Sequence, residues 1–98
     1  MNTTQPAVEI LLDMTPQKNE AILDRVLDGE TVLFNLSTNK LHSLNATASF
    51  IWEQCNGENT VDSLVELLGR SFAVKAEQAE TDLRALLGGM VHAGLIEL

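Results

Sequence analysis

Few side chains in the sequence could act as nucleophiles, proton carriers or metal ligands. Cys55 is the only cysteine, and His42 and His92 are the only histidines. A zinc site normally needs three or four ligands at recognisable spacing, and no further ligand stands at such spacing from either histidine. The 14 Asp and Glu residues signal nothing alone in so acidic a chain, because acid–base catalysis needs two carboxylates at a defined separation. The sequence therefore predicts a protein without catalytic residues, metal or cofactor.

Gly88-Gly89 and Arg84 each leave two interpretations open. A phosphate-binding loop places its glycines between a strand and a helix, whereas this pair lies inside a helical pattern. The glycines either let another backbone approach closely or simply bend the helix. Arg84 either contacts a bound ligand or forms an ion pair with Glu80, four residues earlier.

The charge of the chain restricts its partners. Six Lys and Arg residues against 14 Asp and Glu residues give a formal charge of −8, which opposes binding to nucleic acid or anionic membranes. No apolar run approaches the ~20 residues of a membrane-spanning helix, and the first six residues lack the basic start of a signal peptide. A single cysteine fits a reducing compartment. We therefore expect a cytoplasmic protein with no nucleic-acid and no membrane partner.

Turn residues divide the first half of the chain into a tail and three strands. We interpret residues 1–20 as an N-terminal tail, disordered or an edge segment, ahead of one domain at residues 21–98. Alternation and β-branched residues predict strands at 22–27, 31–36 and 40–44. Asp28-Gly29 between the first two favours a tight hairpin. The three strands form an antiparallel meander, whose first and third strands are edges.

The second half has helical periodicity. Asn45 and Thr60 are suitable N-caps, and apolar residues then recur on one face of each segment. Trp52 and Cys55 share the apolar face of the first helix. This position favours Trp52 as a core anchor rather than a ligand contact. It favours Cys55 as a small buried hydrophobe rather than a nucleophile. A third helix spans residues 76–93, and the apolar end at residues 95–98 packs on the sheet or first helix. The expected apolar positions of the second and third helices are Val61, Leu64, Val65, Leu68 and Phe72, then Ala76, Ala79, Leu83, Leu86, Leu87 and Met90.

These elements predict an α+β fold, a three-stranded antiparallel sheet followed by three helices, similar to a winged helix-turn-helix domain. The run Leu44 to Trp52, with Asn56-Gly57, Thr60 and the ending Gly94-Leu95-Ile96, resembles the PqqD family. The resemblance covers roughly residues 25–98. The sequence departs from the family pattern in two places. Lys75 stands where the family usually has a helix cap, and the Gly88-Gly89 pair within the third helix is unusual.

The resemblance implies a non-catalytic recognition element for ribosomally made, post-translationally modified peptides. Such a domain binds the leader of a precursor peptide and presents it to a modifying enzyme, often a radical S-adenosylmethionine enzyme, as in pyrroloquinoline quinone biosynthesis. The leader would lie in a groove between the third strand and the third helix. The residues expected to contact it are Leu41, His42, Ser43, Arg84, Leu87 and Gly88.

Three other hypotheses remain. A winged-helix regulator would bind DNA through the third helix, although that helix carries Glu77, Glu80 and Asp82. A small interaction subunit would use the same groove for another protein, and exposed edge strands would also favour a homodimer. Finally, residues 1–20 would occupy the groove in cis, in which case their removal would raise the affinity for a leader.

Overall fold

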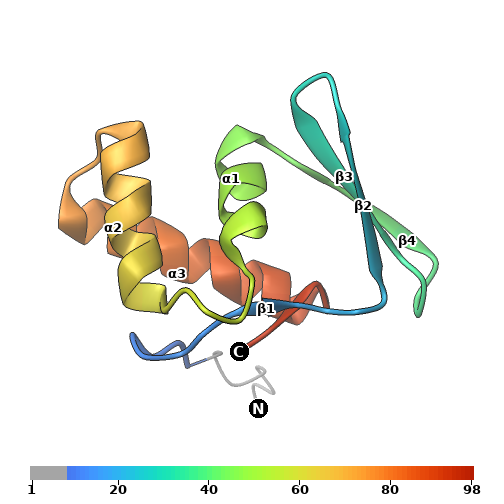
Figure 1. Ribbon diagram of the computed structural model, residues 1–98, viewed down its shortest axis with the longest axis horizontal. Coiled ribbons are helices and arrows are strands. Elements are labelled where there is room, and N and C mark those ends of the chain that lie inside the picture. Colours follow the sequence, from blue (N-terminus) through green and yellow to red (C-terminus); the bar gives the residue numbers. More distant parts are fainter. Residues whose placement is uncertain (1–8) are drawn as a thin grey trace, which may run out of the picture.

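The computed structural model describes residues 9–98 and consists of a small sheet on one side and three helices on the other (Figure 1). Strands β2, β3 and β4 form the antiparallel meander, and three helices follow it. The predicted α+β fold class is therefore confirmed. In chain order the elements are β1 (Gln17–Lys18), β2 (Ile22–Leu27), β3 (Glu30–Asn35), β4 (Lys40–Leu44), α1 (Ala46–Gln54), α2 (Val61–Phe72), α3 (Ala76–His92) and β5 (Ile96–Glu97).

The hairpin between β2 and β3 follows from its two turn residues. Asp28 and Gly29 have φ angles of 52° and 82°, the left-handed values that a two-residue loop with the twist of the strands requires. Leu27 pairs with Glu30 across this turn, so β3 begins one residue earlier than predicted. The turn thereby fixes the register of the sheet, and with it which residues face the helices.

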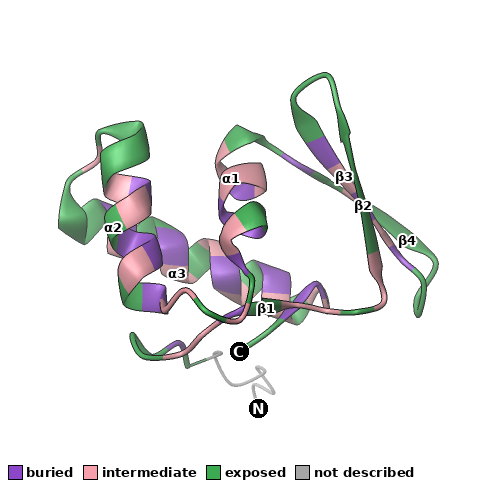
Figure 2. Cartoon of the chain, viewed as in Figure 1, coloured by how far each residue is buried: buried purple, intermediate pink, exposed green. Residues whose placement is uncertain are grey.

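The two faces of β3, the central strand, differ in burial (Figure 2). On β3, Thr31, Leu33 and Asn35 are buried beneath the helices, whereas Val32 and Phe34 are only half-buried on the other side. Trp52 connects α1 to this inner face, because its indole Nε1 donates a hydrogen bond to Asp24 Oδ2 at 2.8 Å. With 1 % of its surface exposed, Trp52 is a core anchor, as predicted.

Local capping sets the starts of the first two helices. The Asn45 side chain accepts a hydrogen bond from the Ala48 amide, and the Thr60 side chain accepts one from the Ser63 amide. Each bond satisfies one of the amides left free at a helix start. Lys75 precedes α3 without any side-chain cap, which agrees with the departure seen in the sequence.

Two residues expected in the core lie at the surface. Phe72, at the last turn of α2, is 39 % exposed and packs edge-to-face against Phe50 with 5.6 Å between ring centroids. Ala76 is exposed because it is the first residue of α3, beyond the reach of the helices that cover the later turns. The other apolar positions that the sequence predicts for the buried faces of α2 and α3 are buried, except for half-buried Leu86.

Residues 9–20, which we call the N-terminal arm, lie across the end of the helical layer opposite the α2–α3 connection (Figure 1). Ile10 and Pro16 are buried, and β1 pairs with β5 in a separate two-stranded sheet. The arm's backbone accepts hydrogen bonds from the first two amides of α2, Val61 N to Met14 O and Asp62 N to Leu12 O. The apolar C-terminal end therefore pairs with the arm rather than with the meander. Residues 1–8 of the expected tail lie outside the described residues.

Candidate functional site

A groove of about 290 Å³ separates β4 from α3. Its lining is mainly apolar, and the ring of His42 is the main polar side chain in its wall. Concave apolar surfaces with a few polar groups are the usual setting of binding sites. The lining residues are His42, Ser43, Leu44, Ala85, Leu86, Gly89, Met90, Ala93 and Leu95.

The strand side of the groove is an open sheet edge. The strand order is β2-β3-β4, so β4 has a neighbour on one side only. Within residues 9–98, backbone hydrogen bonds join β4 to β3 and to no other segment. An edge of this kind offers free N–H and C=O groups to an incoming extended chain.

The helix side of the groove contains a line of small residues beside Leu86 and Met90. Ala85, Gly89 and Ala93 are spaced four apart, so they lie along one line of α3. Apart from the two chain neighbours of Gly89 and the backbone of its own helix, a Cβ atom built on this residue would meet no heavy atom within 4 Å. This line of small residues leaves room for the side chains of a guest between α3 and the strand.

His42 contributes an unpaired polar atom to this apolar setting. Its Nε2 is buried and has no hydrogen-bond partner among the described residues. An unmet donor or acceptor inside a protein is unfavourable by about 1–3 kcal/mol. A hydrogen-bonding group on a guest, reached by a small turn of the half-buried ring, would remove this penalty.

The six residues predicted to contact a ligand occupy four different places. His42 and Ser43 line the groove, whereas Leu41 lies on the outer face of the sheet. Leu87 is fully buried in the core. Arg84 and Gly88 lie on the flank of α3 that faces the N-terminal arm: Gly88 approaches Ile10, and Arg84 donates a hydrogen bond to the Ile10 carbonyl.

One of the two interpretations of Arg84 has a counterpart in the structure. Its Nε lies 3.1 Å from Glu80 Oε2, so the structure contains the ion pair that the spacing allowed. For the glycine pair, Gly88 accommodates the arm and Gly89 opens to the groove, while α3 continues through both. Sequence reasoning missed the groove residues of α3. Their signal is the four-residue spacing of Ala85, Gly89 and Ala93.

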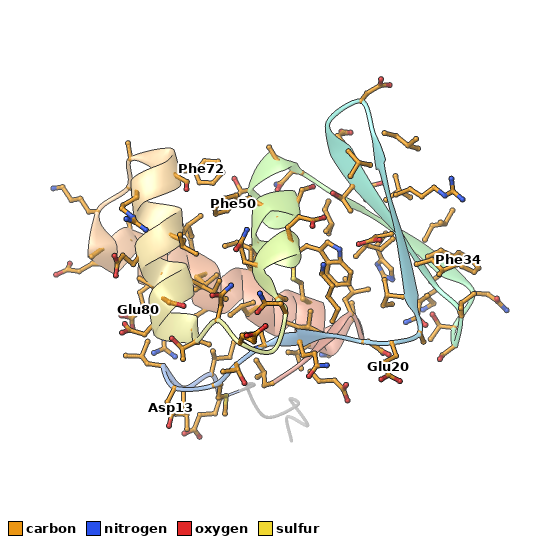
Figure 3. All side chains as sticks on the ribbon, viewed as in Figure 1. Asp13, Glu20, Phe34, Phe50, Phe72 and Glu80 are labelled. Carbon is orange, nitrogen blue, oxygen red and sulfur yellow. The ribbon has the colours of Figure 1, made fainter. Side chains whose placement is uncertain are left out.

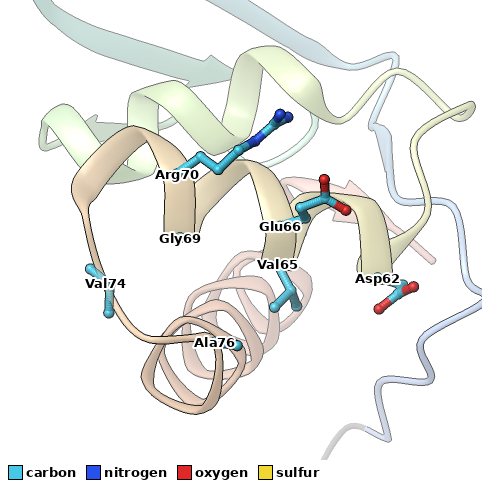
Figure 4. Close-up of a pocket in the computed structure, with 7 residues that line it drawn as sticks. All are labelled: Asp62, Val65, Glu66, Gly69, Arg70, Val74 and Ala76. Atoms are coloured by element: carbon cyan, nitrogen blue, oxygen red, sulfur yellow. The ribbon is translucent and has the colours of Figure 1, made fainter.

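A larger hollow of about 410 Å³ lies between α2 and the start of α3 (Figure 4). It is lined by both acidic and basic side chains, Asp62 and Glu66 together with Arg70, and no edge strand borders it. Because this hollow has no open strand edge along which an extended guest could pair, we place the candidate site at the β4–α3 groove instead.

The described part of the chain contains neither a group of residues suited to bind a metal ion nor a helix suited to span a membrane. Within residues 9–98, no group of three or more His, Cys, Asp or Glu residues could hold a metal ion. In the same range, no helix combines the length and the apolar character needed to cross a bilayer.

Burial disfavours ionisation of the Cys55 thiol and gives the stability of the fold a pH dependence. Desolvation raises its pKa from 9.0 to about 11, and nearby Lys18 opposes the rise only in part. The unfolded chain ionises this thiol near pH 9, whereas the folded chain keeps it neutral. The stability it contributes is therefore complete below pH 9 and falls as the pH rises towards 11.

We expect the free energy of unfolding to fall between about pH 8 and about pH 10.5, by at most about 2–3 kcal/mol from this thiol. Urea unfolding of the wild type and of Cys55→Ala at both pH values measures the effect. The variant lacks the thiol, so its pH dependence should be smaller. Equal pH dependence in the two proteins would show that Cys55 does not contribute.

Comparison with known proteins identifies the family. The profile of the family described as coenzyme PQQ synthesis protein D (PqqD) matches residues 30–96, more than half of the chain. The chain belongs to the PqqD family. A comparison with curated proteins found no match. The PqqD match begins at the start of β3, so it includes β4 and α3 and leaves out the N-terminal arm.

Two solved structures share the fold. The first, TbiB1 in complex with the TbiA(beta) leader peptide, is 26 % identical, with a TM-score of 0.77 over 83 % of this chain and 94 % of that chain. The second, a lasso peptide synthetase B1 complexed with the leader peptide, is 20 % identical, with a TM-score of 0.77 over 86 % of this chain and 99 % of that chain. At 20 % identity, the likeness to the second structure is evidence for the shared fold and for nothing further.

Proposed function

We propose that this protein binds the leader of a ribosomally made precursor peptide and presents the peptide to a modifying enzyme. The observation that carries the proposal is the open edge of β4 beside an apolar groove walled by α3. Membership of the PqqD family and the likeness to TbiB1, whose structure contains a leader peptide, support it.

The geometry suggests how the peptide would bind. An extended leader adds a fourth strand beside β4, and its backbone continues the hydrogen-bond ladder without regard to sequence. Because side chains alternate along a strand, every second side chain points into the groove between His42 and Gly89. Burial of these side chains provides affinity at about 25 cal/mol per Å² of apolar surface. The groove thereby selects which leader binds.

The residues predicted from sequence divide by role in this proposal. His42 and Ser43 contact the leader directly from β4. Arg84 and Gly88 act indirectly, because they join α3 to the N-terminal arm on the flank away from the groove. Leu87 holds α3 against the core.

The protein itself catalyses no reaction in this proposal. Its role is to raise the local concentration of the precursor at an enzyme that supplies the chemistry. The resemblance to PqqD makes a radical S-adenosylmethionine enzyme the first candidate for this partner. Precursor peptides are made by ribosomes, so we expect the protein to act in the cytoplasm.

The alternative of a DNA-binding regulator has no support in the structure. Specific DNA binding needs basic and amide side chains on the helix that enters the major groove. Arg84 is the only Lys or Arg within α3, and it is engaged by Glu80 and by the Ile10 carbonyl. The formal charge of −8 opposes binding further.

A titration tests the proposed function. A synthetic leader from a precursor encoded beside this gene is added to the labelled protein while amide NMR shifts are recorded. We expect the largest shifts in β4 and in the groove side of α3, with saturation. Shifts confined to the hollow between α2 and α3, or no binding by any such leader, would overturn the proposal. A scrambled leader of the same composition is the control.

A further inference from the structure

The outer face of the sheet, which points away from the helices, is apolar and uncovered. Its side chains border a shallow hollow of about 280 Å³. Figure 3 shows Phe34 on this side of the sheet, away from the helices. Leu23 is 56 % exposed and Leu41 is 68 % exposed. The lining residues are Leu23, Arg25, Leu27, Val32, Phe34 and Leu41.

One apolar row crosses the whole face. The strand register pairs Leu23 with Phe34 and Phe34 with Leu41, so the three side chains stand side by side on β2, β3 and β4. Leu41 is the last member of the row and belongs to the open edge of the sheet. It has a cross-strand neighbour on one side only, and it is the most exposed of the large apolar side chains in residues 9–98.

We propose that Leu41 is a specificity-determining residue that contacts the outward-facing side chains of the bound peptide. This inference rests on the proposed function. A strand added to β4 would send alternate side chains to the outer face, and one of them would stand beside Leu41. Cross-strand neighbours of this kind stabilise a sheet when both are apolar.

A contact between Leu41 and the bound peptide would restrict which residues the peptide carries. A strand with one face in water normally alternates apolar and polar residues. In the proposed complex, the inward side chains of the peptide enter the groove beside α3. The outward side chains of the peptide continue the row of Leu23, Phe34 and Leu41. The binding segment of the leader should therefore carry apolar residues at adjacent positions, one for each face of the sheet.

The position of Leu41 favours a peptide over a second copy of the chain as the occupant of this end of the face. Leu41 lies on the same strand that borders the groove, so a single extended chain reaches both surfaces. Two copies of this chain would each carry a formal charge of −8 and would repel one another.

The experiment uses a displayed library of random linear peptides selected against the full-length protein. Leu41→Asp is the test variant. Leu23→Asp is its matched control, because Leu23 belongs to the same row but lies on the opposite edge, at β2. We expect peptides selected by the wild type to carry adjacent apolar residues and to bind Leu41→Asp at least about fivefold more weakly. Their affinity for Leu23→Asp should stay within about twofold of the wild type.

The outcomes separate this inference from the proposed function. Selection of peptides that shift the β4 amides, but bind Leu41→Asp as well as the wild type, would overturn only the role of Leu41. Equal weakening by Leu41→Asp and Leu23→Asp, in proteins of equal thermal stability, would also overturn it and would indicate a partner that covers the whole face. Failure to select any peptide that shifts the β4 amides would overturn the proposed function and this inference together.

Discussion

Replacing Gly89 with leucine is expected to lower the affinity for a leader peptide by more than about tenfold, while the protein remains folded. Gly89 lies in the middle of the α3 wall of the groove, and apart from its chain neighbours and its own helix backbone no heavy atom stands within 4 Å of an added Cβ atom. The new side chain would therefore fill the space that the guest requires without displacing a neighbour. Fluorescence anisotropy of a labelled leader measures the affinity, and thermal unfolding confirms the fold.

Two further variants separate the filling of the groove from the loss of a helical glycine and from the addition of a leucine to α3. Gly89→Ala should raise the free energy of unfolding by up to about 1 kcal/mol, because alanine favours a helix over glycine. Thr81→Leu adds a leucine to an exposed position of α3 outside the groove, so it should leave the affinity unchanged. If Gly89→Leu bound the leader as tightly as Thr81→Leu does, the peptide would not lie against this wall.

The elements set by local signals could be predicted from the sequence. Asp28-Gly29 fixes a hairpin through the φ angles that those two residues tolerate, and the caps at Asn45 and Thr60 each involve a side chain and an amide three residues apart. The stripe that contains Leu83 and Leu87 follows from helical spacing alone. All of these depend on residues close together in the chain.

The groove wall of α3 could not be chosen in the same way. A helix that buries Leu83 and Leu87 has two flanks, and the sequence does not state which flank faces β4. The prediction selected Arg84 and Gly88, whereas Ala85 and Gly89 line the groove. The choice depends on how the sheet and the helix pack together, which is a property of the whole fold.

The pairing partner of the N-terminal arm could not be predicted, for a related reason. Strand β1 has only two residues, too few for an alternating pattern, and its partner β5 lies at the other end of the chain. The polar stretch between Pro16 and Ala21 resembles a loop, yet Lys18 and Asn19 donate backbone hydrogen bonds to the Cys55 and Leu95 carbonyls. Bonds over such separations leave no local trace in a sequence.

Replacing Ile10 with alanine is expected to lower the free energy of unfolding by about 2–4 kcal/mol, as large-to-small changes in a core do. Ile10 is only 4 % exposed, and its Cδ1 lies 3.9 Å from the position of a Cβ built on Gly88. Leu11 is the matched control, because it is the next residue and is 46 % exposed. Leu11→Ala should change the stability by no more than about 0.5 kcal/mol. Urea unfolding of both variants measures the difference.

The same pair of variants decides what the arm does for the groove. Residues 9–20 lie against the flank of α3 that carries Arg84 and Gly88, opposite the flank that lines the groove. If this part of the arm occupied the groove in cis, weakening its attachment would raise the affinity for a leader. Because the arm instead supports α3 from behind, Ile10→Ala should lower that affinity while Leu11→Ala leaves it unchanged. A higher affinity in Ile10→Ala would contradict the supporting role and restore the arm as a competitor for the groove.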